Sequence, residues 1–105
     1  MALHLGRFLI HIPIPSRRRD RIRTVGRAAF RVAEMLHVDV EVREKDNVDV
    51  VWVYYDSGNK KAVLYHDWSR GWDEDYIFKH IKDDLYAKSF LPEHTELQGF
   101  RGVLA

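Results

Sequence analysis

Cysteine is absent from the sequence, and this absence excludes disulfide bonds, thiolate metal sites and cysteine nucleophiles. Long apolar runs are absent as well. The longest, such as residues 50–55, fall far short of the roughly 18–20 residues that a membrane-spanning helix needs. The first residues also lack the order of charge, apolar stretch and small-residue cleavage site that marks a signal peptide. We therefore expect a cytoplasmic protein that makes no contact with a membrane.

Acidic side chains are scarce in the first third of the chain. Residues 1–33 contain eight arginines and one acid, Asp20, which gives a net charge of +7. Residues 34–105 contain nine basic side chains against fifteen acidic ones, a net charge of −6. The overall charge of +1 therefore conceals a strong asymmetry, and for binding a polyanion a basic stripe matters more than the total.

The length and the hydrophobic content of 46% indicate one folded domain, residues 1–105, rather than a disordered chain. Alternating apolar residues predict strands over residues 3–14 and 38–43, a nearly continuous apolar run predicts a central strand over residues 48–55, and residues 60–68 complete the predicted sheet. Apolar residues three and four apart predict two helices, over residues 17–37 and 73–90. The order β-α-β-β-β-α predicts an α+β fold: a two-layer sandwich with a mainly antiparallel sheet, a three-stranded meander and two helices on one face.

Two short turns, residues 44–47 and 56–59, set the register of the predicted meander. In that register one sheet face is aliphatic, and we expect the helices to cover it. Its members are Val38, Val40, Val42, Val51, Val53, Ala62 and Leu64. Gly26 interrupts the apolar stripe of the first helix. Its cost of about 1 kcal/mol relative to alanine suggests that another backbone approaches closely there.

The other face of the predicted meander is aromatic, and its residues are our candidates for an interface or for base stacking. Its members are Val50, Trp52, Tyr54, Val63 and Tyr65. Such a patch needs a partner. The carboxy-terminal tail or another strand could cover it, a second copy could cover it in a homodimer, or bases could stack on it. An acidic rim counts against base stacking: Asp39, Glu41 and Asp67.

The arginine-rich first helix contains our candidates for binding a polyanion. These are Arg17, Arg18, Arg19, Arg23, Arg27 and Arg31. Arg23, Arg27 and Arg31 form a ridge, and like charges four residues apart destabilise a helix by about 0.2–0.5 kcal/mol per pair. Something should offset this repulsion. Phosphate groups would do so, and so would the acidic second part of the chain or an acidic partner.

Asp49, His66 and Asp67 are the only residues that we would test as a catalytic site. The predicted register places Asp49 opposite His66, with Asp67 adjacent. This layout resembles that of restriction-endonuclease-like nucleases, in which an Asp and a Glu-x-Lys on adjacent strands hold a metal. Here the second position reads His66-Asp67-Trp68, with neither Glu nor Lys, so the resemblance covers topology and one aspartate. The alternative is a structural Asp–His hydrogen bond.

We favour a non-enzymatic binding or regulatory module that contacts nucleic acid or another polyanion through its first helix and forms a homodimer through its sheet. The alternative is a homodimeric protein-interaction domain whose interface is the aromatic sheet face and whose arginines meet an acidic protein. A degenerate metal-dependent nuclease comes third. The sequence predicts no cofactor and no resident metal.

Overall fold

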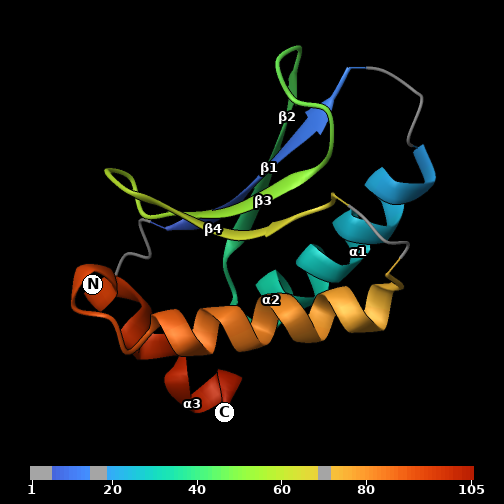
Figure 1. Cartoon of the computed structure of the whole chain (residues 1–105). Helices are drawn as coiled ribbons and strands as arrows, with labels where there is room; N and C mark the ends of the chain where they lie inside the picture. The colour runs from blue at the N-terminus through green and yellow to red at the C-terminus, as the bar shows by residue number, and fades with distance from the viewer. Residues whose placement is uncertain (1–5, 15–18, 69–71) are drawn as a thin grey trace.

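The computed structural model describes residues 6–14, 19–68 and 72–105. Four strands lie in these residues: β1 (Arg7–Pro13), β2 (Asp39–Lys45), β3 (Trp52–Asp56) and β4 (Lys61–His66). The helices are α1 (Arg19–Leu36), α2 (Glu74–Lys88), the 3₁₀ segment η1 (Pro92–Phe100) and α3 (Arg101–Leu104) (Figure 1). None of the helices described is both long enough and apolar enough to cross a membrane.

The strands form one mixed sheet in the order β2-β1-β3-β4. β1 runs parallel to β2 and antiparallel to β3, and β3 runs antiparallel to β4. The α+β class is therefore confirmed, but the predicted three-stranded meander is wrong, because β1 lies between β2 and β3. Phe8, Leu9 and Ile10 are at most 1% exposed, so both faces of β1 are covered, as expected of a central strand. The 44–47 segment does not join neighbouring strands in a hairpin.

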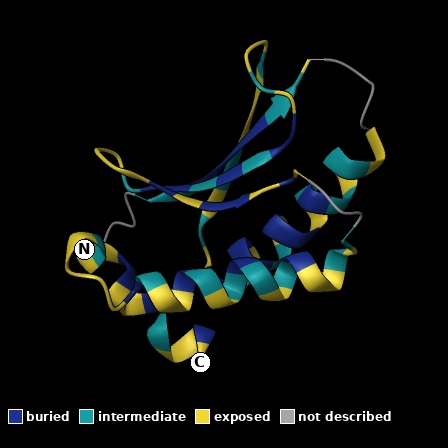
Figure 2. Ribbon diagram, in the orientation of Figure 1, coloured by how far each residue is buried: buried dark blue, intermediate teal, exposed yellow. Residues whose placement is uncertain are grey.

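α1 and α2 both pack against the same face of the sheet (Figure 1), as the sequence predicted. The buried stripe of α2 is the predicted one, Ile77, Ile81 and Leu85, and the Asp73 carboxylate caps its first turn by accepting a bond of 2.8 Å from the Tyr76 amide. The buried residues lie between the helices and the sheet (Figure 2). Most of the predicted aliphatic face is there, because alternation along a strand does not depend on strand order.

Gly26 does not have the predicted contact. A Cβ atom built on it would meet no other atom within 4 Å, so the described part of the chain brings no backbone close to it. The expectation of close approach within the chain was wrong. Gly26 instead faces a cavity of about 270 Å³ beside β2.

A β-bulge in β4 changes which side chains share a face. Val53 pairs with Tyr65 while Tyr54 pairs with Val63, so Leu64 has no partner across the strands. Directly opposed residues point to the same side, and Val53 is in the core. Tyr65 therefore points into the core and is 5% exposed. The prediction that Tyr65 lies on the aromatic face was wrong, because the one-residue slip reverses its direction.

A buried ion pair joins the start of α1 to the end of β4. Arg21 donates from Nε and Nη2 to the two carboxylate oxygens of Asp67, both at 2.8 Å, and from Nη1 to the Trp72 carbonyl oxygen at 2.8 Å. The Tyr65 hydroxyl donates to Asp67 at 2.6 Å. The Asp67 side chain is 1% exposed. The hydrogen bond between Arg21 and Asp67 is the main reason that the pKa of Arg21 is raised.

We expect Asp67→Ala to lower the free energy of unfolding by about 3–5 kcal/mol, because it leaves the Arg21 charge and the Tyr65 hydroxyl without their partner. The matched control is Asp83→Ala, which removes an exposed pair with Lys79 at 2.9 Å and should cost no more than about 0.5 kcal/mol. Urea unfolding followed by circular dichroism measures both. Equal losses for the two variants would contradict a stabilising role for the buried pair.

Candidate functional site

The sheet face that points away from α1 and α2 carries four rings in mutual contact, which we call the ring row: His11, Tyr54, Trp52 and His66. Trp52 and Tyr54 are two residues apart on β3 and stack at 6.0 Å with an interplanar angle of 12°. His66, opposite Trp52 on β4, lies 4.9 Å from it. His11 on β1 lies 5.0 Å from Tyr54. Three adjacent strands thus supply one continuous row of rings.

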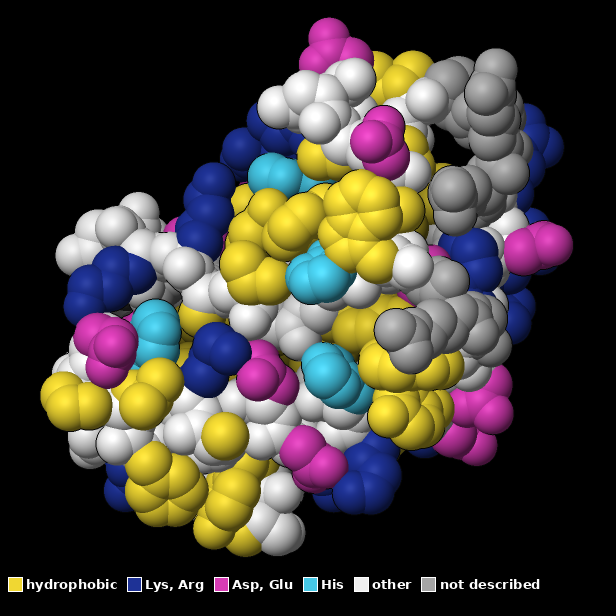
Figure 3. Space-filling view, viewed as in Figure 1, with side chains coloured by type: hydrophobic (Ala, Val, Ile, Leu, Met, Phe, Trp, Pro, Cys, Tyr) yellow, Lys and Arg dark blue, Asp and Glu magenta, His cyan; other side chains and the backbone are white. Residues whose placement is uncertain are grey.

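The carboxy-terminal tail packs as expected, but on the helical side of the sheet. Phe100 in η1 places its ring 5.8 Å from the ring of Tyr55, and Tyr55 belongs to the core. In the described residues the tail therefore does not cover the ring row, and this explanation of the aromatic face is wrong. Figure 3 shows hydrophobic side chains gathered with histidines over the sheet at the surface.

Positive charge surrounds the ring row. The pKa of His11 is lowered, first by burial and then by the charges of Lys45, Lys61 and Arg43, against the opposing effect of Glu41. The ammonium nitrogen of Lys61 lies 5.9 Å from the centre of the Tyr54 ring. At His11 the charges of these three cations therefore outweigh that of Glu41.

The predicted acidic rim is weaker than the sequence suggested. Asp67 is buried on the core side with Arg21. Glu41 is within 3.1 Å of Arg7 and also accepts a hydrogen bond from Arg43. Asp39 is exposed and makes no ion pair among the described residues, so it is the one member of the predicted rim that still opposes phosphate groups.

Two polar side chains of the ring row, His11 and Tyr54, add no negative charge to it. The Nε2 atom of His11 is buried and has no hydrogen-bond partner among the described residues, so it is not accessible to a ligand in this arrangement. The lowered pKa keeps this imidazole neutral at pH 7. Burial raises the pKa of Tyr54, so its hydroxyl keeps its proton. The row therefore does not repel an anionic ligand.

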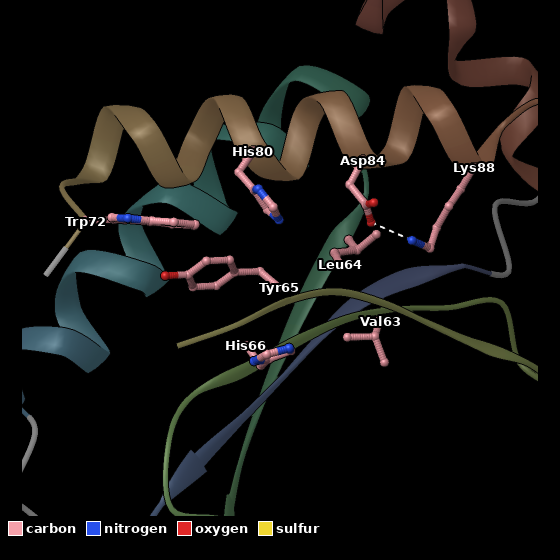
Figure 4. A pocket seen from close by; sticks show the side chains of 8 residues that line it. All are labelled: Val63, Leu64, Tyr65, His66, Trp72, His80, Asp84 and Lys88. Atoms are coloured by element: carbon pink, nitrogen blue, oxygen red, sulfur yellow. Dashed lines mark hydrogen bonds and ion pairs between the residues drawn. The ribbon is translucent and has the colours of Figure 1, made fainter. Parts of the chain in front are cut away.

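His66 also belongs to a groove of about 280 Å³ between the β4 edge and α2. The groove is lined by Val63, Leu64, Tyr65, His66, Trp72, His80, Asp84 and Lys88. Trp72 and His80 point toward Tyr65 from the helical side (Figure 4), with ring separations of 6.1 and 5.5 Å. Lys88 donates to Asp84 at 2.7 Å. The groove extends the ring row around the edge of the sheet.

The three candidate catalytic residues do not meet. Trp52, rather than Asp49, lies opposite His66, and Asp49 is exposed in the connection before β3. Asp67 is held by Arg21 and Tyr65. The predicted register was wrong for two reasons: the β3–β4 turn lies at residues 57–60 rather than 56–59, and the bulge shifts the pairing by one further residue. Within the described ranges no three His, Cys, Asp or Glu side chains are grouped to hold a metal ion.

The candidate arginines divide into two groups. Arg31 donates to Glu74 at 3.0 Å and to Asp75 at 2.8 Å, and its guanidinium lies 4.1 Å from the centre of the Phe78 ring. The acidic second part of the chain therefore neutralises Arg31. The remaining described candidates are exposed: Arg19, Arg23 and Arg27. Arg17 and Arg18 lie outside the described residues, and whether the helix binds a polyanion stays a prediction.

Sequence reasoning did not find His11, and it assigned His66 to catalysis rather than to the row of rings. The sequence did offer a signal for His11: it lies two residues after Leu9, on the second apolar face of the strand. Placing that strand in the middle of the sheet would have set His11 beside Tyr54. No family model, curated protein or solved structure matches the chain, so the site is interpreted from its geometry alone.

We expect the stability of the protein to fall as the pH drops below about 6.5, in part because of His11. Its pKa is lower in the folded chain than the ordinary 6.5, so below that value the unfolded chain binds the proton more readily and unfolding becomes easier. His11→Gln removes this contribution. Urea titrations at a series of pH values should therefore show a shallower decline for His11→Gln than for the unaltered chain. Parallel curves would contradict the prediction.

Proposed function

We propose that this protein binds single-stranded nucleic acid, with bases stacked on the ring row. The observation that carries the proposal is an open sheet face on which Trp52, Tyr54 and two histidines form a continuous row beside three cationic side chains. Within the row His66 is exposed, Trp52 and Tyr54 are partly exposed, and His11 is buried. Accessible aromatic rings beside cations are the features that single-stranded binding surfaces share. The role is that of a non-enzymatic binding module, as the sequence favoured, but the surface is the sheet rather than the first helix.

The geometry favours a single strand over a duplex. Bases in a duplex are already stacked and paired, so only their edges are accessible, whereas bases in a single strand offer their faces. The ring row lies across β1, β3 and β4, with Trp52 and Tyr54 nearly parallel and the two histidines inclined to them, and its length suits two or three successive bases. The groove beside His66 offers space of about 280 Å³ for a further base or a sugar. Stacking tolerates every base, so we expect weak sequence preference.

Two lysines beside the ring row can contact a phosphate backbone. Lys61 and Lys45 lie on opposite sides of the row, because β4 and β2 are the two edges of the sheet. Neither lysine makes an ion pair with a carboxylate of the described chain, so both are available to phosphate oxygens. With two such contacts, the logarithm of the affinity should fall against the logarithm of salt concentration with a slope of about −1.4.

We expect Trp52→Ala and Tyr54→Ala each to weaken binding of a fluorescent oligothymidine or oligouridine by about tenfold, since one stacked base contributes about 1–3 kcal/mol. Lys61→Ala should reduce the salt slope. Fluorescence anisotropy measures the affinity of each variant. The matched control is Tyr86→Ala, which removes an exposed tyrosine of α2 and should leave the affinity unchanged.

The same variants separate the proposal from its two rivals. If the first helix binds the polyanion, an Arg23→Ala and Arg27→Ala double variant will abolish binding while Trp52→Ala has no effect. If the aromatic face is instead a homodimer interface, Trp52→Ala will halve the mass in solution and the unaltered chain will not bind the oligonucleotide. Either result would overturn the proposal.

A further inference from the structure

β2 lies at one end of the sheet with an unpaired edge. Its only neighbour is β1, and in the described ranges no other segment pairs with it. Its outward amide and carbonyl groups are therefore available to another strand, which is a surface that proteins usually protect. Seven residues, Asp39–Lys45, are available for pairing.

We propose that two copies of the protein pair through β2, antiparallel about a two-fold axis at Val42, to give one continuous sheet. The order of charges in β2, Asp-Val-Glu-Val-Arg-Glu-Lys, is self-complementary in this register. Asp39 of each copy lies opposite Lys45 of the other. Glu41 lies opposite Arg43, and Val42 lies opposite its own counterpart. Opposite charges directly across an antiparallel pair stabilise it, and like charges destabilise it.

Neighbouring registers lack this complementarity. A shift of two residues in one direction places Glu41 opposite its own copy, and a shift in the other direction places Arg43 opposite its own copy. Each shift also shortens the ladder. A shift of one residue would reverse the faces and put α1 of the second copy on the wrong side of the sheet. In the register centred on Val42, Asp39 opposes Lys45 and Glu41 opposes Arg43, while Glu44 lies opposite Val40 of the other copy. It is therefore the register among these three in which no like charges are opposed.

A groove along the same edge indicates what the second copy would cover. The cavity of about 270 Å³ has almost entirely apolar walls, formed by Ile10, Ile12, Ile22, Arg23, Gly26, Arg27, Phe30 and Val42. Phe30 is 52% exposed and Val42 is 49% exposed, although both are large apolar residues. In the described chain nothing approaches the Cβ position of Gly26.

Edge pairing would bring α1 of the second copy beside this groove. Strands in a sheet are about 4.8 Å apart, and α1 packs over both β1 and β2. The two α1 axes would then lie roughly 10 Å apart, the separation of packed helices. The second copy supplies the close approach of another helix that Gly26 suggested. Arg23 and Arg27 of both copies would be near the axis, but their long side chains can reach water past the apolar contact.

The other edge of the sheet does not have these features. β4 has the sequence Lys-Ala-Val-Leu-Tyr-His, with no acidic residue to pair with its lysine. It also contains the bulge at Leu64, which interrupts a regular ladder. Self-association is therefore expected at β2 alone. It leaves the ring row uncovered, but it pairs Lys45 with Asp39 of the second copy, so Lys61 is the lysine of the row that stays available to phosphate in the dimer. The inference itself does not depend on the proposed function.

The decisive variants are Asp39→Lys and Lys45→Asp, because neither residue makes an ion pair within the described chain and reversing their charges should not disturb the monomer. Asp39→Lys puts a second lysine opposite Lys45 of the other copy, and Lys45→Asp puts a second acid opposite Asp39. Each variant alone should raise the dimer dissociation constant by about tenfold or more. An equimolar mixture should form a heterodimer, because both cross-strand pairs are then again of opposite sign.

Sedimentation equilibrium at low and high micromolar concentrations measures the mass of each sample. Glu41→Arg and Arg43→Glu form a second pair for the same test, and Glu93→Arg, far from β2, is the control that should leave the dimer intact. A monomer at every concentration of the unaltered chain would overturn the proposal. So would a dimer unaffected by all four reversals, or one lost only with Trp52→Ala, which would assign the interface to the ring row.

Discussion

β1 has strands on both sides and side chains packed on both faces, and the rest of the architecture depends on this burial. Phe8 and Ile10 belong to the core beneath the helices, whereas Leu9 and His11 belong to the opposite face. Because β1 occupies the middle, β2 is displaced to an edge and β3 is brought beside His11. The unpaired edge and the row of rings are therefore two consequences of one central strand.

Much of the fold could be predicted from local pattern, but the strand order could not. Three features depend only on residues that are close together in the sequence. They are the apolar stripes of α1 and α2, the Asp73 cap, and the alternation of side chains between the two faces of a strand. The position of β1 between β2 and β3 depends on contacts far apart in the sequence. A helix of 18 residues between β1 and β2 does permit a parallel pair, and the apolar run of β1 is typical of a central strand. Combining these two signals would have predicted the observed order.

The candidate site was predicted in part. Trp52 and Tyr54 were assigned to an exposed face from alternation alone, which holds in any strand order. Tyr65 and Asp67 were misplaced because a bulge has no reliable signal in sequence, and everything beyond it reverses direction. The arginine-rich segment shows a different limit. Arg21 and Arg31 are neutralised by acids more than 40 residues away, so composition showed the excess charge but not which arginines remain exposed.

Because of the bulge at Leu64, the number of residues in β4 determines which of its side chains lie on the surface, in addition to the types of those residues. With regular alternation through β4, Tyr65 and Asp67 would both turn to the open face, away from Arg21 of α1. One inserted residue thus moves the Tyr65 ring from the surface into the core, where its hydroxyl donates a buried hydrogen bond to Asp67. The loss or gain of a single codon at this point would convert one arrangement into the other, although every side chain involved kept its identity.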